Sequence, residues 1–514
     1  MFNYTSEKQL NIFDFKTEFE SKLNPDNRWV KMAKLLDWDA FASIYGSSFS
    51  SKMGAKGVDA RVVIGALIIK HLEAKDDRGT IEMIQENPYM QYFLGFDHFS
   101  SKPVFDPSLF VHIRKRLGCD DFDKMNQIII NKALNINNQE AKKDAKNDDS
   151  DDDLKPIEST NSGKVQFDAT IADADIKYPT DLNLLNDSRE KSEEIIDKLC
   201  HGLQIEKPRT YRRNARKSWL NLSKSKRKSH KQIQTGIKQQ LNYLKRNLKN
   251  IDEIAKKNPL SLLQLESKNY KYLLIIRELY RQQLEMYQQK KHSISNRIIS
   301  IHQPHIRPMV RGKLGTNVEF GAKINVSLQE GYTRIDQISF EAFNEGGCMI
   351  EQLERFKKLN GHYPELANTD QIYMTRENRK FLKENDIRHT AKPLGRKPKI
   401  EMNRYQKDKL KRERGERNHI EGKFGQGKIK YGLSNIKARL ADTSISWIAA
   451  IMFVMNILKI AKDSSFAFFC LVWQHILATT IKIDFGNNQK LIAIKNLKSE
   501  ILKFKNEHAI QLLY

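Results

Sequence analysis

Residues 165–172 read VQFDATIA and are bounded by Gly163 and Asp173. Apolar and polar residues alternate along this stretch, which is the pattern of a β-strand with one buried face. Asp168 stands inside the apolar pattern, where a carboxylate without a partner would cost free energy. Such an acid is either paired with a base or coordinates a metal ion, and the second option fits a carboxylate on a central strand. The stretch therefore predicts a central strand with a candidate metal ligand.

The chain after residue 300 adds further elements to this strand. Strand signals cover residues 318–326 and 335–343, and a helix is expected over 348–360. A short strand-like piece then leads to Asp370, and a new helix begins at Glu377. The order strand, strand, strand, helix, strand, helix predicts a mixed α/β (α+β) fold. Taken alone, Asp370 is equally well explained as a helix cap or a turn aspartate, which is common.

Residues 412–439, RERGERNHIEGKFGQGKIKYGLSNIKAR, are mostly basic and carry Glu421 in their middle. Arg417 precedes this acid by four residues, so on a helix the two side chains share a face. Lys428 lies two turns further on if the intervening glycines leave the helix intact. One interpretation is a surface ion pair on a basic helix. The other is a carboxylate that binds a metal ion, with cations beside it to hold phosphates.

Composition narrows the class of partner. The 514 residues include 88 Lys and Arg against 63 Asp and Glu, which gives a formal charge of +25. An excess of this size indicates that the binding partner is a polyanion, most often nucleic acid. The alternative partner is an anionic membrane surface. The length predicts two or three domains.

Cysteine usage and hydropathy indicate the compartment. The four cysteines are far apart and form no CxxC pair, so neither a zinc ribbon nor a disulfide framework is supported. The first residues do not read as a signal peptide. Residues 466–483 approach the length of a membrane span, but Gln474, His475 and two threonines interrupt them, so a buried helix or strand is expected. We therefore expect a cytoplasmic protein with no membrane partner.

Residues 28–134 are expected to form a small helical domain. Asp59 caps one helix, a second starts at Thr80, and a third carries Arg114 and Arg116. Short turns between such helices are compatible with a helix-turn-helix that contacts DNA through these two arginines. A domain for packing or dimerisation fits the same pattern equally well.

Two segments stand apart from the predicted domains. The composition of the first does not favour a packed core, and the second has no pattern to which a role can be assigned. Residues 137–163 hold almost no apolar side chains and a dense acidic run at 148–153, so an acidic disordered linker is expected. This run could compete for a basic groove or simply add solubility. Residues 462–514 could be a dimerisation or packing segment, or a frameshifted or degenerate tail.

A helical, highly charged insertion is expected at about residues 187–300, after the first strand. Residues 237–254 place apolar side chains at steps of three or four, which predicts helix packing. Residues 207–231 contain many basic residues, interleaved aromatic residues and no acid. This segment is a candidate patch for a nucleic-acid backbone, and the alternative is a solvated helix face. The candidate contacts in it are Arg212, Arg213, Arg216 and Lys217.

Three of the acids suggest a common site. Asp168 on the first strand, Asp370 after a later strand and Glu421 on a helix beyond them would converge in a mixed sheet of the ribonuclease-H type. Hard oxygen ligands select Mg²⁺ or Mn²⁺. Two such ions about 3.5–4 Å apart clamp the attacking and leaving oxygens of a phosphoryl displacement. The chain has no GxxxxGK[ST] loop, so ATP as a fuel is not indicated.

Four motifs carry a family resemblance. They are FDATIADADIKYPTDLNLLNDSRE around Asp168, RGKLGTNVEFGAKI at 311–324, ANTDQIYMTRENRKFLKENDIR around Asp370 and RGERNHIEGKFGQGKIKYGL around Glu421. With them, roughly residues 30–460 resemble bacterial insertion-sequence transposases of the DDE class, in the insertion-sequence-five-like group with an InsH-like N-terminal domain.

The last motif is the most specific of the four. Related families show a tyrosine, an arginine three residues later, a glutamate four further on and a lysine seven beyond that. Arg417, Glu421 and Lys428 match this spacing, whereas Arg414 stands where the tyrosine would be. The departure leaves the acid intact and puts any stacking role of the tyrosine in doubt.

The resemblance implies a ribonuclease-H-like DDE catalytic domain over residues 164–460. In it, Asp168, Asp370 and Glu421 would be the metal-binding triad for two Mg²⁺ or Mn²⁺ ions. The implied reaction is cleavage of double-stranded DNA at the terminal inverted repeats of the element, followed by attack of the freed 3′-hydroxyl on target DNA.

The resemblance also implies partners and a location. Arg417 and Lys428 would hold DNA near the scissile phosphate, the arginine as a fork and the lysine as a point charge. A homodimer is expected because two ends must be joined, and the expected location is the cytoplasm, in association with the nucleoid. The rival functions are a metal-dependent nuclease without strand transfer and a catalytically degenerate DNA-binding relic.

Overall fold

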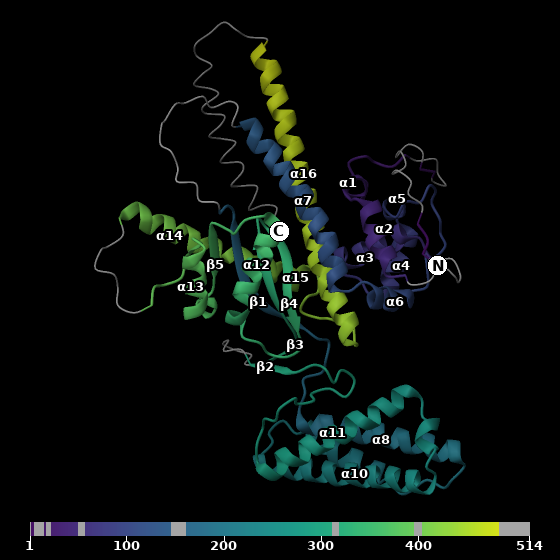
Figure 1. Ribbon diagram of the computed structural model, residues 1–514. Helices are drawn as coiled ribbons and strands as arrows, with labels where there is room; N and C mark the ends of the chain where they lie inside the picture. The colour runs from purple at the N-terminus through teal and green to yellow at the C-terminus, as the bar shows by residue number, and fades with distance from the viewer. Residues whose placement is uncertain are drawn as a thin grey trace. The chain divides into compact units, whose positions relative to one another are not determined.

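The computed structural model describes residues 2–4, 15–16, 22–49, 57–144, 161–310, 318–394 and 403–482. The chain divides into two compact units, residues 1–459 and 460–514. Figure 1 traces the ribbon and labels its elements. The acidic run at 148–153, the first part of the motif at 311–324 and the chain beyond residue 482 lie outside the described residues.

A mixed sheet forms the centre of the first unit. Its strand order is β2-β3-β1-β5-β6, and β4 also pairs with β3. β1 is antiparallel to β3 and parallel to β5, while β4 is antiparallel to β3 and β6 is parallel to β5. The mixed α/β fold expected from the sequence is confirmed. The strands are β1 (Lys164–Asp173), β2 (Pro308–Val310), β3 (Val318–Gln329), β4 (Tyr332–Ser339), β5 (Leu366–Thr369) and β6 (Arg388–His389).

The hairpin between β3 and β4 is tighter than the sequence suggested. The second of the two strands was expected over 335–343, but β4 begins at Tyr332. Glu330 and Gly331 both adopt positive φ angles, 50° and 84°. Two consecutive residues with positive φ close a two-residue hairpin whose twist matches that of the strands, so β4 starts directly after them.

Helices cover both faces of the sheet (Figure 1). On one face, Ala172 and Val326 share a buried cluster with Phe424 of α15 and with α16. On the opposite face, Phe167 packs with Leu353 of α12 and with residues around α13. This burial of both faces explains why β1 is apolar along most of its length. The helices and turns involved are η4 (Glu345–Cys348), α12 (Met349–Asn360), η5 (Gln371–Tyr373), α13 (Arg376–Glu384), α14 (Arg404–Glu416), α15 (Asn418–Lys430) and α16 (Ala441–Lys482).

Helices precede the sheet in the described part of the chain. Phe453 of α16 lies 5.5 Å from Phe41 and 5.6 Å from Phe122, measured between ring centroids, so these helices share a core with α16. The helix α7 reaches Asp144 and so enters the stretch that the sequence suggested as linker. The helices are α1 (Arg28–Leu35), α2 (Trp38–Ser47), α3 (Ala60–Leu72), α4 (Asp77–Glu86), α5 (Pro88–Phe93), α6 (Leu109–Arg116) and α7 (Cys119–Asp144).

A helical bundle is inserted between β1 and β2. Its own buried cluster contains the apolar stripe of residues 237–254, as the spacing predicted. The first helix begins at Asp181, earlier than the expected start near residue 187, because Thr180 caps it by accepting a hydrogen bond from N of Asn183. The elements are α8 (Asp181–Leu203), α9 (Arg212–Lys224), α10 (His230–Lys257), η3 (Ser261–Gln264) and α11 (Ser267–Gln289).

The helix α16 is the most apolar long helix among the described residues. Its segment Ala441–Ser464 is long and apolar enough to cross a membrane by length and composition. However, 78% of its most apolar window is buried inside the protein, as in a core helix. The helix continues to Lys482 and so covers much of the apolar run at 466–483, for which a helix or strand was expected.

Candidate active site

Asp168 and Asp370 stand level with each other on neighbouring parallel strands. Phe167 of β1 pairs with Thr369, the last residue of β5, so the next residue after each is one of the two acids. Asp370 also caps η5, because its carboxylate accepts a hydrogen bond of 2.6 Å from N of Gln371. The cap interpretation is therefore confirmed, and it holds the carboxylate at the end of the strand beside β1.

Arg417 links Asp370 to Glu421. Its Nη1 lies 3.1 Å from Oδ1 of Asp370, and its Nη2 lies 2.9 Å from Oε1 of Glu421. Arg417 lowers the pKa of Asp168 and Glu421 raises it, so both act on the third acid electrostatically. Asp370 and Glu421 thus share one guanidinium, and Asp168 of β1 lies within its electrostatic reach.

Asp168 is the most buried of the three acids. Burial raises the pKa of its carboxyl to about 6, and the negative charges of Glu345 and Glu421 add to this rise. A hydrogen bond of 2.8 Å from N of Ala169 and the charge of Arg417 act in the opposite direction. Burial is therefore the largest cause of the raised pKa, and it favours the protonated form of this carboxyl.

The chemistry of these side chains fits a hard divalent cation. All three donors are carboxylates, which are ligands that Mg²⁺ and Mn²⁺ prefer. Two of the three, Asp370 and Glu421, already face a cation, since both pair with the guanidinium of Arg417. Within the described ranges, no three acidic, histidine or cysteine side chains are close enough to count as a formed metal cluster.

The helix α15 passes through its glycines without a break. A Cβ at Gly422 or Gly425 would meet no atom within 4 Å, so no close neighbour requires glycine at these positions. The cost of the two glycines to the helix is the backbone entropy that they lose on folding. Lys428 follows two turns after Glu421 and forms an ion pair of 3.5 Å with Asp173 at the end of β1. The lysine is therefore held at the same strand as Asp168.

Arg414, which stands in the position of the family's tyrosine, has a structural contact. Its Nε donates a hydrogen bond of 2.8 Å to the carbonyl oxygen of Thr390. One residue earlier, Glu413 is buried and receives two hydrogen bonds from Arg388, at 2.7 and 2.9 Å. These contacts fix α14 to the edge of the sheet, just before the chain reaches Arg417.

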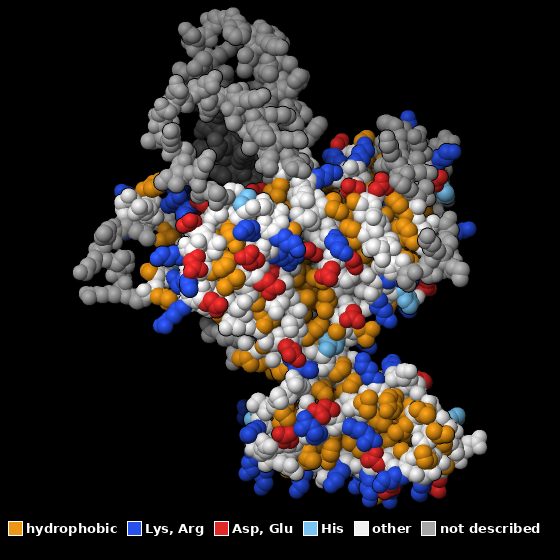
Figure 2. All heavy atoms as spheres, viewed as in Figure 1, with side chains coloured by type: hydrophobic (Ala, Val, Ile, Leu, Met, Phe, Trp, Pro, Cys, Tyr) orange, Lys and Arg blue, Asp and Glu red, His pale blue; other side chains and the backbone are white. Residues whose placement is uncertain are grey.

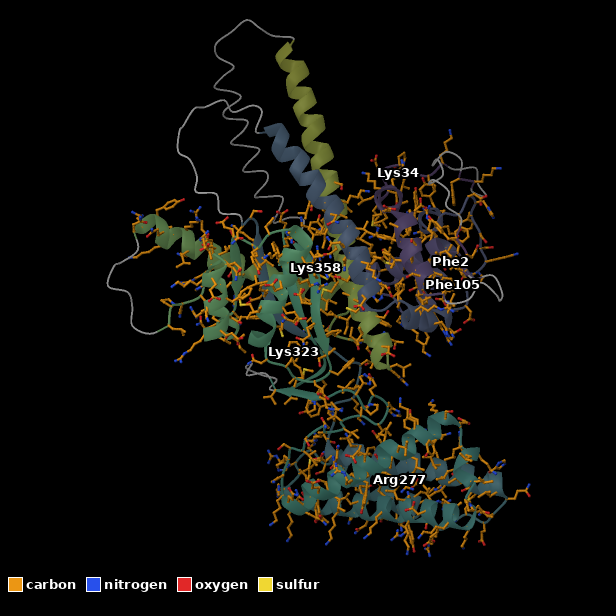
Figure 3. All side chains as sticks on the ribbon, in the orientation of Figure 1. Phe2, Lys34, Phe105, Arg277, Lys323 and Lys358 are labelled. Atoms are coloured by element: carbon orange, nitrogen blue, oxygen red, sulfur yellow. The ribbon has the colours of Figure 1, made fainter. Side chains whose placement is uncertain are left out.

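Sequence reasoning missed a fourth acid beside the site. Glu345 raises the pKa of both Asp168 and Tyr373 and pairs with Lys323 of β3 at 2.9 Å. Figure 3 marks Lys323 on its strand. The hydroxyl of Tyr373 donates a hydrogen bond of 2.7 Å to Asn325. The motif around residues 311–324 already contained Lys323, but the pairing with Glu345 has no local sequence signal.

The expected DNA contact of Arg114 is contradicted. Its side chain is buried and makes a forked pair with Asp77, at 2.9 and 2.8 Å, so its donors face a carboxylate inside the protein. Its guanidinium also lies 5.0 Å from the ring of Trp447. Arg116 is exposed instead, with its guanidinium 4.6 Å from the ring of Phe49. The two neighbouring arginines therefore differ in access to solvent.

The basic candidates of the insertion lie on α9. Arg212 makes a forked pair with Asp197 of α8, with both distances 2.9 Å. Arg213, Arg216 and Lys217 are exposed. This part of the bundle is separate in sequence from the three acids.

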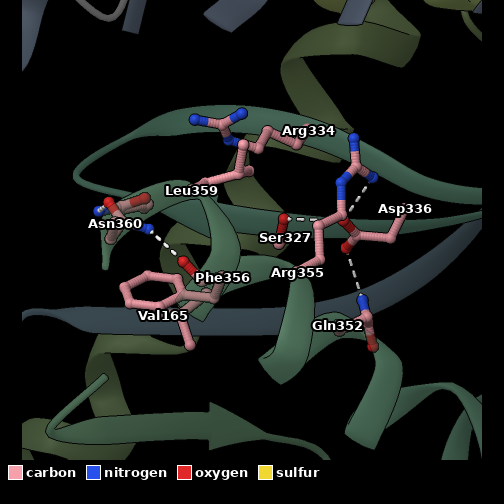
Figure 4. Close-up of a pocket in the computed structure, with 10 residues that line it drawn as sticks. Val165, Ser327, Arg334, Asp336, Gln352, Arg355, Phe356, Leu359 and Asn360 are labelled. Carbon is pink, nitrogen blue, oxygen red and sulfur yellow. Dashed lines mark hydrogen bonds and ion pairs between the residues drawn. The ribbon is translucent and has the colours of Figure 1, made fainter. Parts of the chain in front are cut away.

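A small cavity lies elsewhere, against α12 (Figure 4). Arg355 donates to Asp336 at 3.1 Å and pairs with Asp123 of α7 at 2.7 Å. Gln352 donates a second hydrogen bond, of 2.6 Å, to Asp336. Burial raises the pKa of Asp336 to about 6. These groups connect α7 to the sheet, and we assign them no chemistry.

Comparison with known proteins adds a family to this geometry. Residues 368–458 match the model of the "Transposase DDE domain", and residues 17–116 match a "Transposase domain (DUF772)". The first range contains Asp370 and Glu421, and Asp168 lies before it. No solved structure matches the chain.

A curated relative matches a smaller part. "Uncharacterized protein ORF8 in nfe locus" of Rhizobium meliloti is 28% identical over 120 residues, which are 23% of this chain and 58% of that protein. The chain therefore matches little more than half the length of that relative. The two family matches, the helical one first and the DDE one after it, make the chain similar to transposases over residues 17–116 and to the DDE domain of transposases over residues 368–458.

Proposed function

We propose that the protein binds the ends of an insertion sequence, cleaves them and transfers the freed strand to target DNA through Asp168, Asp370 and Glu421. The observation that carries this proposal is the register of β1 and β5, which sets two acids level, together with the guanidinium of Arg417 between Asp370 and Glu421. The strand order supports a ribonuclease-H-like arrangement of the catalytic domain over residues 164–460.

In this function the three acids would hold two divalent cations, Mg²⁺ or Mn²⁺. When bound, such ions activate the attacking oxygen and stabilise the leaving oxygen of a phosphoryl displacement. The chain's own residues bind and orient the DNA. Arg417 exchanges its carboxylate partners for a phosphate, which its planar fork fits, and Lys428 supplies a point charge at the end of β1.

The partners follow from the reaction. Double-stranded DNA is the partner in two roles, first as the terminal inverted repeats of the element and then as the target. Two ends must be joined, so we propose a homodimer as the active complex. The exposed Arg116 is the remaining candidate for a DNA contact from the N-terminal helices. The proposed location is the cytoplasm, in association with the nucleoid.

Substitution of each acid tests the proposal. Purified protein is mixed with labelled DNA that carries the element's own ends, with Mg²⁺ or with a chelator. Asp168→Asn, Asp370→Asn and Glu421→Gln should each abolish cleavage while DNA binding persists. Cleavage that survives in one of these variants would remove that residue from the triad.

Two other functions keep the same site. A metal-dependent nuclease would cleave the ends but would not join them to target DNA, and a joining assay separates the two. A degenerate relic would bind DNA and cleave nothing, even with Mg²⁺ present. The complete set of three acids with Arg417 and Lys428 around them favours the active enzyme.

A further inference from the structure

The insertion carries a long stretch without negative charge. From Lys207 to Ile251 there are fifteen Lys and Arg residues and no Asp or Glu. This stretch forms α9 and most of α10, which pack against each other. In Figure 2, Lys and Arg side chains gather along the edge of the bundle formed by α10. The stretch without acids is therefore shared by two helices that contact each other.

Nearby acids do not cancel this charge. Asp197 of α8 is shared by Arg212, at 2.9 Å, and Lys207, at 3.5 Å. Glu193 is buried against Arg189 at 2.6 Å. The remaining basic side chains of α9 stay exposed to solvent. Their summed field attracts a polyanion.

A cleft of about 580 Å³ runs between α9 and α10. Leu222 is its single apolar lining residue, and Lys231 is its cation. The other lining side chains are hydroxyls and amides that can donate hydrogen bonds, apart from Gly236, namely Ser218, Asn221, Ser225, Ser229, Gln232, Thr235 and Gln239.

Gly236 of α10 lies against the side chain of Leu222 of α9. A Cβ added there would lie 2.4 Å from Cδ2 of Leu222 and 3.3 Å from Cδ1 of Leu182. An added methyl group would displace the end of the Leu222 side chain, which lines the cleft, so the lining of the cleft is sensitive to this position.

Three exposed cations of α9 flank the cleft. Arg213, Lys217 and Lys224 follow one another at steps of four and seven, so they lie on one face of the helix. That face adjoins Asn221 and Ser225, which line the cleft. Arg216 lies on a different side of α9, and Arg212 is held by Asp197. The cations beside the cleft are therefore a distinct subset of the basic residues.

We propose that this cleft binds the sugar–phosphate backbone of duplex DNA without reading its sequence. Arg213, Lys217, Lys224 and Lys231 neutralise phosphates, and the hydroxyl and amide groups bond phosphate and sugar oxygens. A lining with one apolar side chain and no aromatic ring offers no surface on which bases stack. The proposal rests on the proposed function, since it names where a DNA-processing enzyme holds DNA away from its acids.

The test measures affinity against salt for the full chain. Fluorescent duplexes of the element's end and of unrelated sequence are titrated at several salt concentrations. The variant Arg213→Ala/Lys217→Ala/Lys224→Ala should lower the slope of log affinity against log salt by about 2–3, because each lost phosphate contact removes about 0.9. At about 0.1 M salt its affinity should fall roughly tenfold or more, and by the same factor for both duplexes.

A matched control removes the same charge from the same bundle. Lys256→Ala/Lys257→Ala/Lys268→Ala also neutralises three exposed lysines, two at the end of α10 and one at the start of α11. This control should keep the wild-type slope. An unchanged slope in the α9 variant, or an equal loss in the control, would overturn the proposal, because binding would then follow net charge alone.

A second variant tests the cleft without touching charge. Gly236→Ala should weaken binding at least threefold while the circular dichroism spectrum stays helical, because the new Cβ displaces the Leu222 side chain in the lining of the cleft. Wild-type affinity in this variant would assign binding to surface charge and overturn the role of the cleft.

The same experiment separates this proposal from the catalytic one. Cleavage of element ends by the wild-type protein decides the proposed function, and the salt slope of the α9 variant decides the role of the cleft. If the wild-type protein cleaves nothing while the α9 variant loses the salt dependence of binding, the catalytic proposal is overturned and the DNA cleft stands. If the wild-type protein cleaves element ends and the α9 variant keeps the wild-type salt slope, the role of the cleft is overturned and the catalytic proposal stands.

Discussion

Nη2 of Arg417 lies 2.9 Å from Oε1 of Glu421, one helical turn further along the chain. The arginine stands at the junction of two helices, as C-cap of α14 and N-cap of α15, and its second nitrogen holds Asp370. A single side chain therefore neutralises two candidate metal ligands. Any divalent cation that binds these acids competes with Arg417 for them.

Removal of this arginine should strengthen the response to metal. In Arg417→Ala the carboxylates lose their internal cation, so added Mg²⁺ should raise the melting temperature by more than it does in the wild type. A thermal melt over a series of Mg²⁺ concentrations measures this. Arg281→Ala, which removes an exposed pair with Glu278 on α11, serves as the control. Equal Mg²⁺ responses in Arg417→Ala and in the wild type would mean that the acids do not bind the ion.

Asp168 should make stability depend on pH. Its pKa is raised to about 6, so the folded state binds the proton more tightly than the unfolded chain does. The charged carboxylate therefore destabilises the fold above about pH 6, and this penalty disappears below about pH 4, where both states are protonated. Asp168→Asn should stabilise the protein by roughly 2 kcal/mol at pH 8 and by almost nothing at pH 4. Urea unfolding at the two pH values tests this, and equal effects at both would contradict it.

Arg355 should be a structural residue rather than a site residue. It lies between Asp336 and Asp123, and its loss leaves Asp336 buried without its cation (Figure 4). Arg355→Met should therefore destabilise the fold by about 3 kcal/mol, and adding Asp336→Asn should recover most of that loss. Urea unfolding of the single and double variants measures both terms. A double variant no more stable than Arg355→Met would show that Asp336 is not the reason for the loss.

Two glycines should respond to alanine in opposite directions. A Cβ at Gly321 would lie 1.9 Å from the carbonyl oxygen of Ala172, so Gly321→Ala must separate β3 from β1 and should cost about 3 kcal/mol or more. Gly425 has no atom within 4 Å of an added Cβ and lies inside α15, so Gly425→Ala should stabilise by about 0.5–1 kcal/mol. Thermal unfolding of both variants decides this, and a loss at Gly425 would mean that α15 needs its flexibility.

Local pattern was enough for part of the fold and of the candidate site. The alternation of VQFDATIA predicted β1, and the four-residue spacing of Arg417 and Glu421 predicted their pairing, because both follow from the geometry of one element. The closeness of Asp370 to these residues required the register of β1 and β5. That register depends on strands almost two hundred residues apart in the chain, and no local pattern reports it.

Arg114 shows where sequence reasoning fails. The run of three basic residues in α6 is the same pattern as an exposed DNA-binding helix, yet burial separates Arg114 from its neighbours. The cause lies in Asp77, well upstream, and in Trp447 on α16, far downstream. Only the packed structure shows which arginine meets them. Glu345 was missed for a related reason, since its pairing with Lys323 joins a turn to a strand.

The insertion also determines the order in which the nascent chain can fold. β1 ends at Asp173 and its antiparallel partner β3 begins at Val318, so the ribosome must first make residues 174–317. At about 5–20 residues per second this takes roughly 7–30 s, during which an apolar strand has no partner. The bundle has its own buried cluster and can fold in that interval. The acids of the candidate site come together later still, after Glu421 has been synthesised, so the chain completes its proposed DNA-holding unit before its catalytic one.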